Sequence, residues 1–382
     1  MDDPVGSGHD VLSFLVEWFD PLPQIAKQYL LKYFVRSNEM EMVELKTRRL
    51  FLKRSPCPQH FSAKEFALGN KVILYGRDLV VVSYADKPTE AALSQQSESA
   101  AFLIGPGDRS AMGAILDEII TETKGSLAKL RSVLLQKEEA VEVARCLGLE
   151  GQAKREGTGA FDCDSNGGDY VVFAVVRGSN IGMLGKKICD DLRVRFGGDG
   201  TKLRVWWAGS GKGAEDLEGM LAPGDPVATR RQGKSSATFD GCTCCVIKPH
   251  VVNAGKAAKI IGRILSEGYE VTAVEMFRLD RGQAKEFLEV YQGVVPNFGE
   301  MVDEMTAGPC IALEVRGQDV VQRFRETAGP WDMDMAKELR PNSIRGMFGE
   351  TGARTGVHCT DLAEDGPLES RYFFELMQSG VQ

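Results

Sequence analysis

The feature that most constrains the fold is an internal repeat between two stretches of the chain. Residues 102–106 (FLIGP) are matched by residues 245–249 (CVIKP), and an apolar run ending in Val-Arg-Gly closes each copy at 176–178 and 315–317. Between these runs each copy carries an amphipathic helical pattern, a strand pattern and an acidic helical pattern. The helical patterns cover 111–120 and 137–144 in the first copy, and 257–265 and 283–291 in the second. A β-α-β-β-α-β layout accounts for this order, so each copy is predicted to form one sheet with helices on one face.

Two changes in composition divide the chain into three blocks. With 382 residues, the chain is too long for one ordinary core. Residues 87–100 are small and polar, and residues 222–236 combine prolines, glycines and a basic run. Both segments are predicted to be linkers. The blocks that they separate span 10–87, 100–222 and 238–377.

The first block is predicted to be mostly β. It contains short runs that are rich in β-branched and aromatic residues and are punctuated by glycine, proline, asparagine or aspartate. These runs cover 30–35, 41–45, 49–53, 71–76 and 79–84. The step Gly76-Arg77-Asp78 between the last two runs suits a hairpin. No catalytic constellation accompanies these strands, so the block is interpreted as a binding or packing module.

Charge and targeting signals narrow the partners and the compartment. A net charge of −8 does not favour nucleic-acid binding. The basic clusters at 46–54 and 230–234 are typical of a solvated surface, and contact with an acidic partner is the alternative. The N-terminus has no basic region followed by an apolar run, and no apolar stretch is long enough to span a bilayer. We expect no signal peptide and no membrane contact, and we expect the nine cysteines to be reduced intracellular thiols.

A cysteine cluster raises the alternative of a zinc site. Cys242, Cys244 and Cys245 lie close together in the sequence, with His250 nearby as a fourth ligand. In a strand, Cys242 and Cys244 share one face while Cys245 points to the other. The spacing therefore favours buried thiols, and no metal site is predicted.

One of the four histidines lies among residues that suit phosphate chemistry. His358 follows Arg345 and precedes Asp361 in a glycine-rich stretch, and an apolar run further upstream ends at Lys248. Lysine and arginine can hold phosphates while a histidine accepts a phosphoryl group. The set predicts phosphoryl transfer through a phosphohistidine, or the remnant of such a site.

The third block closely resembles a nucleoside diphosphate kinase domain. The resemblance rests on residues 247–250 (IKPH), 301–309 (MVDEMTAGP), 341–349 (PNSIRGMFG) and 357–361 (VHCTD). The first block resembles the DM10 module, and the matching residues are 17–21, 51–54 and 69–72. A DM10 module followed by two kinase-like domains is similar to the arrangement of the nucleoside diphosphate kinase 7 family, over nearly the whole chain.

This resemblance implies an α+β protein with three domains. A small β-rich, PH-like DM10 domain spans 10–87, a degenerate ferredoxin-like kinase domain spans 100–222, and a second one that keeps the histidine spans 238–377. The resemblance also implies a location in the ciliary or flagellar axoneme, inside doublet microtubules, within the cytoplasm and its cytoskeleton. The implied partners are tubulin, other axonemal proteins and the γ-tubulin ring complex, with nucleotide as a further ligand.

The family's mechanism gives roles to four residues of the third block. His358 matches the histidine that takes the γ-phosphate from a triphosphate and passes it to a diphosphate. Lys248 matches the lysine that contacts the transferring phosphate and the ribose hydroxyl. Arg345 matches one phosphate-clamping arginine, whose planar fork suits the task, and Arg325 is the expected match for the second.

Three further residues are expected to support the site. Glu369 lies where a carboxylate fixes the tautomer of the imidazole, so that the other ring nitrogen can attack. Asp361 matches a structural aspartate just after the histidine. Thr355 occupies the position of an asparagine that contacts the ribose in the family, so it is a nucleotide-binding candidate that departs from the pattern. If the domain turns over, Mg²⁺ is expected to accompany the nucleotide.

Other departures from the family pattern put activity in doubt. Leu288 stands where a tyrosine usually helps to place the γ-phosphate, and Tyr291 lies one helical turn away as a substitute. Pro296 replaces a phenylalanine that stacks on the base, and Trp331 replaces a phosphate-binding threonine. In the second block, Gly105 stands where the lysine belongs, and no histidine occurs between His60 and His250.

Two functions from different classes follow. The leading hypothesis is a structural protein of the axoneme, because one kinase-like domain lacks its nucleophile and the other has lost several helper groups. The alternative is an active nucleoside diphosphate kinase that works through a phosphohistidine at His358. A module that binds nucleotide without transferring phosphate is a third hypothesis.

Overall fold

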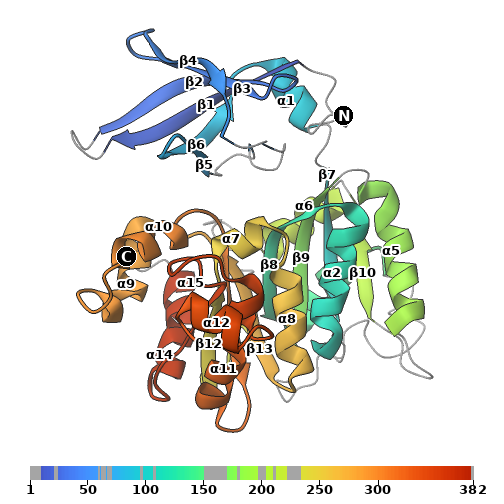
Figure 1. Cartoon of the computed structure of the whole chain (residues 1–382). Helices are drawn as coiled ribbons and strands as arrows, with labels where there is room; N and C mark the ends of the chain where they lie inside the picture. Colours follow the sequence, from blue (N-terminus) through green and yellow to red (C-terminus); the bar gives the residue numbers. More distant parts are fainter. Residues whose placement is uncertain are drawn as a thin grey trace. The chain divides into compact units, whose positions relative to one another are not determined.

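The computed structural model describes most of the chain (Figure 1). The described residues are 10–20, 25–58, 61, 66, 71–94, 98–105, 109–149, 170–178, 181–196, 204–209, 212–221 and 234–379. Tertiary contacts group the chain into two units, 1–97 and 98–382. Most of the second expected linker, residues 222–233, lies outside the described residues.

The N-terminal unit is a six-stranded antiparallel sheet with the order β4-β3-β2-β1-β6-β5. Its strands are β1 (Val11–Asp20), β2 (Ile25–Phe34), β3 (Glu39–Glu44), β4 (Leu50–Pro56), β5 (Lys71–Leu74) and β6 (Arg77–Tyr84). All five predicted runs are strands, and β1 is an additional strand. Its alternating residues Leu12, Phe14 and Val16 are fully buried, so β1 has the period of a strand with one face in the core.

The predicted hairpin between the last two strands is confirmed. Leu74 pairs with Arg77, which leaves Tyr75 and Gly76 as a two-residue loop. Both residues have positive φ angles, 49° and 74°, as a type I′ turn requires. The glycine takes this conformation at little cost, whereas Tyr75 adopts a backbone region that side chains disfavour.

The prediction that residues 87–100 form a linker is wrong. Residues Lys87–Ser94 form helix α1, and strand β7 begins at Glu98. The Asp86 carboxylate accepts a hydrogen bond from the backbone N–H of Thr89 at 2.8 Å, which starts the helix. The Thr89 hydroxyl in turn accepts from the backbone N–H of Ser13 on β1 at 2.9 Å. A small, polar composition therefore encodes a docked helix here.

The second unit contains a nine-stranded sheet that runs through both copies of the repeat. The path is β10-β7-β9-β8-β13-β14-β12-β15, and β11 pairs with β8 off this path. The first copy supplies β7 (Glu98–Ile104), β8 (Ser126–Leu134), β9 (Tyr170–Gly178) and β10 (Val205–Ala208). The second supplies β12 (Cys242–Ile247), β13 (Glu270–Phe277), β14 (Cys310–Arg316) and β15 (Val357–Cys359), with β11 (Lys234–Ser235) before them. The copies appear in mirrored order and meet where Arg131 of β8 pairs with Glu275 of β13.

Helices cover both faces of this sheet, so the expectation of helices on one face is wrong. In the first copy they are α2 (Met112–Thr123), α3 (Lys137–Cys146), α5 (Ile181–Phe196) and α6 (Lys212–Leu221). In the second they are α7 (Pro249–Asn253), α8 (Ala257–Ser266), α9 (Arg281–Phe287), α10 (Phe298–Met305), α11 (Val320–Ala328), α12 (Met333–Leu339), α13 (Ile344–Phe348), α14 (Asp365–Arg371) and α15 (Met377–Ser379). One core lies under α2, α5, α8 and α11; the other face is covered by α3, α6, α9 and α10. Continuous apolar strands such as β9 and β12 need cover on both sides, which explains the difference.

Helices α2 and α8 join the two copies along one face of the sheet, and Figure 1 shows them side by side. The two helices meet at Gly113 and Gly262. A Cβ atom built on Gly113 would lie 2.2 Å from the backbone nitrogen of Gly262. Glycine at position 113 therefore permits backbone contact between the helices. Among the described helices, none has the length and apolar character that a membrane crossing needs.

Candidate functional site

The predicted nucleophile lies on the short edge strand β15 and is almost fully buried. His358 is 2% exposed, and its Nε2 atom lies 2.9 Å from a carboxylate oxygen of Glu369 on α14. The same oxygen accepts a hydrogen bond from the Thr360 hydroxyl at 2.8 Å. An ionised carboxylate can only accept, so Nε2 carries the proton and Nδ1 keeps its lone pair. Nδ1 has no hydrogen-bond partner among the described residues, so it is the nitrogen available for attack.

Lys248 lies at the end of β12, where the chain turns into α7. It is 3% exposed, and its Nζ atom donates to the backbone oxygen of Ala353 at 2.7 Å. Burial, and then the positive charge of Arg345, lower the pKa of Lys248 to about 7, while Glu304 acts in the opposite direction. Near neutral pH the lysine therefore carries only part of the charge that a phosphate clamp needs.

Replacing Lys248 with methionine is expected to stabilise the protein at low pH. The folded protein must keep a charged lysine buried below about pH 7, whereas the unfolded chain holds its proton up to about pH 10.5. The variant should gain about 1–3 kcal/mol in free energy of unfolding at pH values below 7. The gain should shrink as the pH rises from 7 to 10.5, because wild-type stability increases over that window. Urea unfolding across this range measures the difference.

Lys259 on α8 provides the matched control, because it is exposed. Methionine at position 259 should change stability little at any pH in the series. A Lys248 variant whose stability parallels that of wild type over the whole series would contradict the charge argument.

Trp331 lies close to Lys248 and Arg345, the two cations expected to hold phosphates. The Nζ atom of Lys248 is 5.4 Å from the centre of the indole ring, and the guanidinium carbon of Arg345 is 5.2 Å from it. Tyr291 packs against the indole with 5.6 Å between ring centres. Arg345 is buried, and it also donates to the backbone oxygen of Gly329 at 2.8 Å. The indole therefore makes a cation–π contact with each of these two side chains.

Arg325 is held by Asp361, the last residue of the histidine motif at 357–361. Its guanidinium donates to the Asp361 carboxylate at 2.8 Å and to the backbone oxygen of the same residue at 2.6 Å. The other carboxylate oxygen of Asp361 accepts from the Tyr291 hydroxyl at 2.6 Å. Burial and this carboxylate raise the pKa of Tyr291 well above its usual value, so the phenol stays protonated. The expected substitute tyrosine is thus committed to Asp361.

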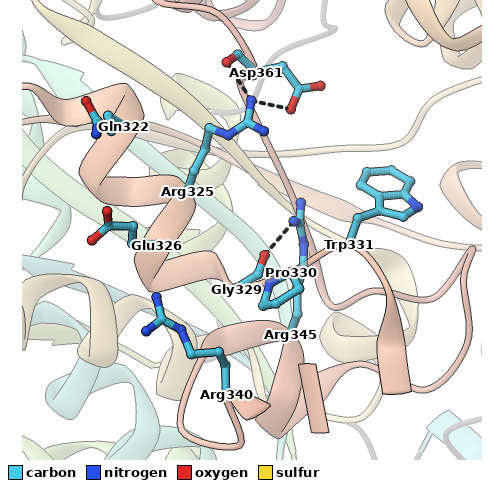
Figure 2. Close-up of a pocket in the computed structure, with 9 residues that line it drawn as sticks. All are labelled: Gln322, Arg325, Glu326, Gly329, Pro330, Trp331, Arg340, Arg345 and Asp361. Carbon is cyan, nitrogen blue, oxygen red and sulfur yellow. Dashed lines mark hydrogen bonds and ion pairs between the residues drawn. The ribbon is translucent and has the colours of Figure 1, made fainter. Parts of the chain in front are cut away.

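A cavity of about 370 Å³ opens beside these residues. Arg325, Arg340 and Arg345 line it together with Trp331 and Asp361, whereas His358 and Lys248 do not. Figure 2 shows Arg325 directed at Asp361, and Arg345 beside Gly329 and Trp331. Three guanidinium groups and two carboxylates, those of Glu326 and Asp361, give the cavity a net positive charge suited to an anion.

Three further positions named from the sequence, Thr355, Leu288 and Pro296, are either buried or lack a polar side chain. Thr355 is fully buried, and its hydroxyl donates to the backbone oxygen of Val357 at 3.2 Å, so that hydroxyl serves a local turn. Leu288 is buried in the core, and Pro296 is exposed. The role of Thr355 in nucleotide binding stays a prediction that this geometry does not support.

The cysteines of the zinc alternative lie on opposite faces of β12, as their alternation predicts. Cys244 and Cys245 are both fully buried, in the cores on the two sides of the sheet. Burial raises the pKa of each thiol well above its usual value. The Nδ1 atom of His250 lies 2.7 Å from the Glu304 carboxylate. This histidine is therefore engaged with a carboxylate rather than with the cysteines.

Comparisons with known proteins identify the family of this chain. The family model described as Nucleoside diphosphate kinase matches residues 241–378. Nucleoside diphosphate kinase homolog 7 of Rattus norvegicus is 31% identical over 382 residues, covering 96% of this chain and 93% of the rat protein. The protein of the same name from Mus musculus is 31% identical over 380 residues, with the same coverage of 96% and 93%. The chain belongs to the nucleoside diphosphate kinase homolog 7 family.

Relatives with a single kinase domain match only part of this homolog 7 chain. Nucleoside diphosphate kinase of Aquifex aeolicus is 35% identical over 132 residues, covering 35% of this chain and 92% of the relative. An orthorhombic crystal form of the Aquifex aeolicus enzyme covers 36% of this chain at 34% identity, with a TM-score of 0.34.

The first copy of the repeat in this homolog 7 chain has a tryptophan where the second has its histidine. Ile104 pairs with Val205, and the next pair is Leu103 with Trp206. In the second copy the corresponding pairs are Ile247 with Val357, and Val246 with His358. Strand register therefore makes Trp206 the counterpart of His358, and Gly105 the counterpart of Lys248. Sequence reasoning did not find Trp206, although aligning residues 205–208 (VWWA) with 357–360 (VHCT) would have revealed it.

The tryptophan ring fills the space that a lysine would need. A Cβ atom on Gly105 would lie 2.8 Å from the ring of Trp206 and 2.6 Å from the Cβ atom of Arg204. Even alanine is excluded at position 105 without movement of its neighbours. Both kinase-like copies of this homolog 7 chain thus have a tryptophan at a position where the family's chemistry places a phosphate-handling residue.

Proposed function

We propose that this protein is a structural component of axonemal doublet microtubules that uses kinase-like folds as scaffolds, with phosphoryl transfer strongly reduced. The observation that carries the proposal is the placement of Trp331 against Lys248 and Arg345. Each cation–π contact stabilises by about 0.5–2 kcal/mol. A γ-phosphate would have to displace both contacts before it could reach the clamp.

The first kinase-like copy supports the same proposal. It has Trp206 at the position of the nucleophile and Gly105 at the position of the lysine, yet its central strand β9 is buried at every position except Arg177. A fold that keeps its core while it loses its reactive groups is suited to assembly. The continuous sheet gives a rigid body in which both copies can present surfaces to partners.

The N-terminal unit is proposed to act as a DM10 module that contacts partners. Its edge strand β4 exposes Leu50 and Phe51, which are 56% and 40% exposed, next to the basic residues Lys53 and Arg54. Apolar and basic groups together suit an acidic protein surface such as that of tubulin. Other axonemal proteins and the γ-tubulin ring complex are further proposed partners.

Extraction of isolated axonemes tests the structural role. After detergent treatment and a high-salt wash, the protein should remain with the doublet microtubules, because a component of the lattice is held by many contacts. A His358→Ala variant should be retained as well as wild type, since assembly does not need the nucleophile. Complete release by detergent alone would contradict the proposal.

An active nucleoside diphosphate kinase is the second candidate, and the His358–Glu369 pair favours it. The free Nδ1 lone pair can attack the γ-phosphorus of a nucleoside triphosphate, while the bond to the β-phosphate oxygen breaks and the diphosphate leaves. The phosphoryl group on Nδ1 would then pass to the terminal oxygen of a second diphosphate. Mg²⁺ would enter as part of the nucleotide substrate.

Labelling with γ-³²P ATP distinguishes the two candidates. Under the structural proposal, acid-labile label on His358 should form at least ~100-fold more slowly than on the Aquifex aeolicus enzyme, because displacing two cation–π contacts raises the barrier by about 3 kcal/mol. The His358→Ala variant is the control and should carry no acid-labile label. Labelling of wild type at the rate of the Aquifex enzyme would establish the kinase and overturn this part of the proposal.

A further inference from the structure

A second cavity lies where the two copies of the repeat meet in the sheet. Its volume is about 280 Å³. Lys129 and Arg131 of β8, Phe173 of β9, Glu275 of β13 and Arg278, which follows β13, contribute to its lining. None of these residues takes part in the site around His358. Figure 1 shows β8 and β13 adjacent at this junction.

Glu275 is a buried carboxylate that lines the cavity and has one oxygen without a hydrogen-bond partner. The residue is 1% exposed. Its Oε2 atom accepts from the side-chain amide of Gln378 at 2.5 Å and lies 3.4 Å from Nε of Arg131. Its Oε1 atom is buried and has no hydrogen-bond partner among the described residues. A buried oxygen without a donor is costly, so the site favours a ligand that can donate to it.

Positive charge is in excess around this carboxylate. Lys129 is paired with Glu218 of α6 at 2.9 Å, and Arg131 faces Glu275. Arg278 makes no ion pair with any residue that the structure describes, and it lies at the end of β13. Partial burial, and then the nearby charge of Arg177, lower the pKa of Arg278. Arg131 and Arg278 both line the cavity, so two guanidinium groups can donate to an anion bound there.

We propose that this cavity binds a small oxyanion that carries its own proton, of which hydrogen phosphate is the simplest. The cations hold the negatively charged oxygens, and the P–OH group donates a hydrogen bond to Oε1 of Glu275. The cavity volume exceeds what one phosphate needs. Because Arg131 and Glu275 belong to different copies of the repeat, the bound anion contacts both copies and stabilises their junction.

The carboxylate gives the site a means of selecting between anions. Hydrogen phosphate keeps a proton at about pH 8, whereas sulfate of the same shape keeps none and can only accept. Sulfate would therefore place an unprotonated oxygen against Oε1, and two acceptors in contact repel each other. The proton on hydrogen phosphate therefore decides which anion binds, because phosphate and sulfate have nearly the same size and geometry.

The selectivity depends on pH. Burial raises the pKa of Glu275 to about 7, and the charge of Arg131 opposes this. Above pH 7 the ionised carboxylate accepts from phosphate and rejects sulfate; below it, the protonated group can donate to either ion. Arg131 of β8 is the charged group that faces Glu275 directly, and Lys129 of β8 and Arg278 after β13 line the same cavity. Behind them, Glu218 of α6 pairs with Lys129, and the charge of Arg177 of β9 acts on Arg278.

Isothermal titration calorimetry of the full chain tests the proposal with inorganic phosphate and sulfate as probes. At about pH 8, phosphate should bind at least ~10-fold more tightly than sulfate, and at about pH 6 the two affinities should converge. Glu275→Gln should abolish the discrimination at about pH 8, because the amide can donate as well as accept. Arg278→Gln should weaken phosphate binding by about 10-fold, and Arg278→Lys should restore most of it.

The arginine-lined cavity beside His358 can also attract phosphate, so Arg345→Gln provides the comparison. Phosphate binding at the junction should survive this change. Phosphate binding that is lost in Arg345→Gln but intact in folded Arg278→Gln would overturn the proposal. So would equal affinities for phosphate and sulfate at about pH 8 in wild type, or no phosphate binding. Circular dichroism of each variant establishes that it is folded.

Discussion

Replacing Trp331 with threonine is expected to raise the rate of phosphohistidine formation on His358 by about 10- to 100-fold. The substitution removes the indole from Lys248 and Arg345, and the corresponding barrier change is about 1.4–2.7 kcal/mol. Threonine also introduces a hydroxyl that can donate to a phosphate oxygen. Single-turnover labelling with γ-³²P ATP measures the rate.

Two further variants show whether the ring causes the effect. Trp331→Phe keeps an aromatic face near the cations and should remain close to wild type. The Trp331→Thr, His358→Ala double variant should carry no acid-labile label. A folded Trp331→Thr protein that labels no faster than wild type would mean that the indole is not the barrier, and the missing helper groups at Leu288 and Thr355 would then account for low activity.

Gly113→Ala is expected to destabilise the second unit by about 2–4 kcal/mol in free energy of unfolding. The new Cβ atom would lie 2.2 Å from the backbone nitrogen and 2.4 Å from the Cα atom of Gly262. Backbone cannot yield as a flexible side chain can, so α2 and α8 must separate and expose part of the core between the copies. Chemical denaturation followed by circular dichroism measures the loss.

Gly262→Ala is the matched control, and its effect should have the opposite sign. The nearest atom to a Cβ at position 262 is 3.8 Å away, an ordinary van der Waals distance. Alanine within α8 should therefore stabilise by about 0.5–1 kcal/mol through helix propensity alone. Equal effects of the two substitutions would show that the helices do not meet as the structure has them.

Much of the architecture was predictable, because it depends on local patterns that the sequence repeats. The matching runs before Gly105 and Lys248 predicted two related α+β copies, and the structure has them. Strand β1 was missed even though it alternates. Helix α1 was misread as a linker because composition does not report the contact between Thr89 and Ser13.

The sequence predicted which residues make up the site, but it did not predict the contacts that Trp331 makes with the two cations. His358 and Glu369 are eleven positions apart in the sequence, and the structure pairs them as expected. The sequence also identified Trp331 as a departure from the pattern. Only the folded chain places its ring against Lys248, far away in the sequence, and against Arg345.

The sequence by itself determined the repeat, the family membership and the candidate phosphate-handling residues, because each depends on residue type and order. The tertiary structure decided the rest. It joined the two copies into one sheet, mirrored about the Arg131–Glu275 pair, and it revealed that a tryptophan replaces the nucleophile of the first copy. These features arise from contacts between residues distant in the chain, and such contacts depend on strand register and packing rather than on local sequence.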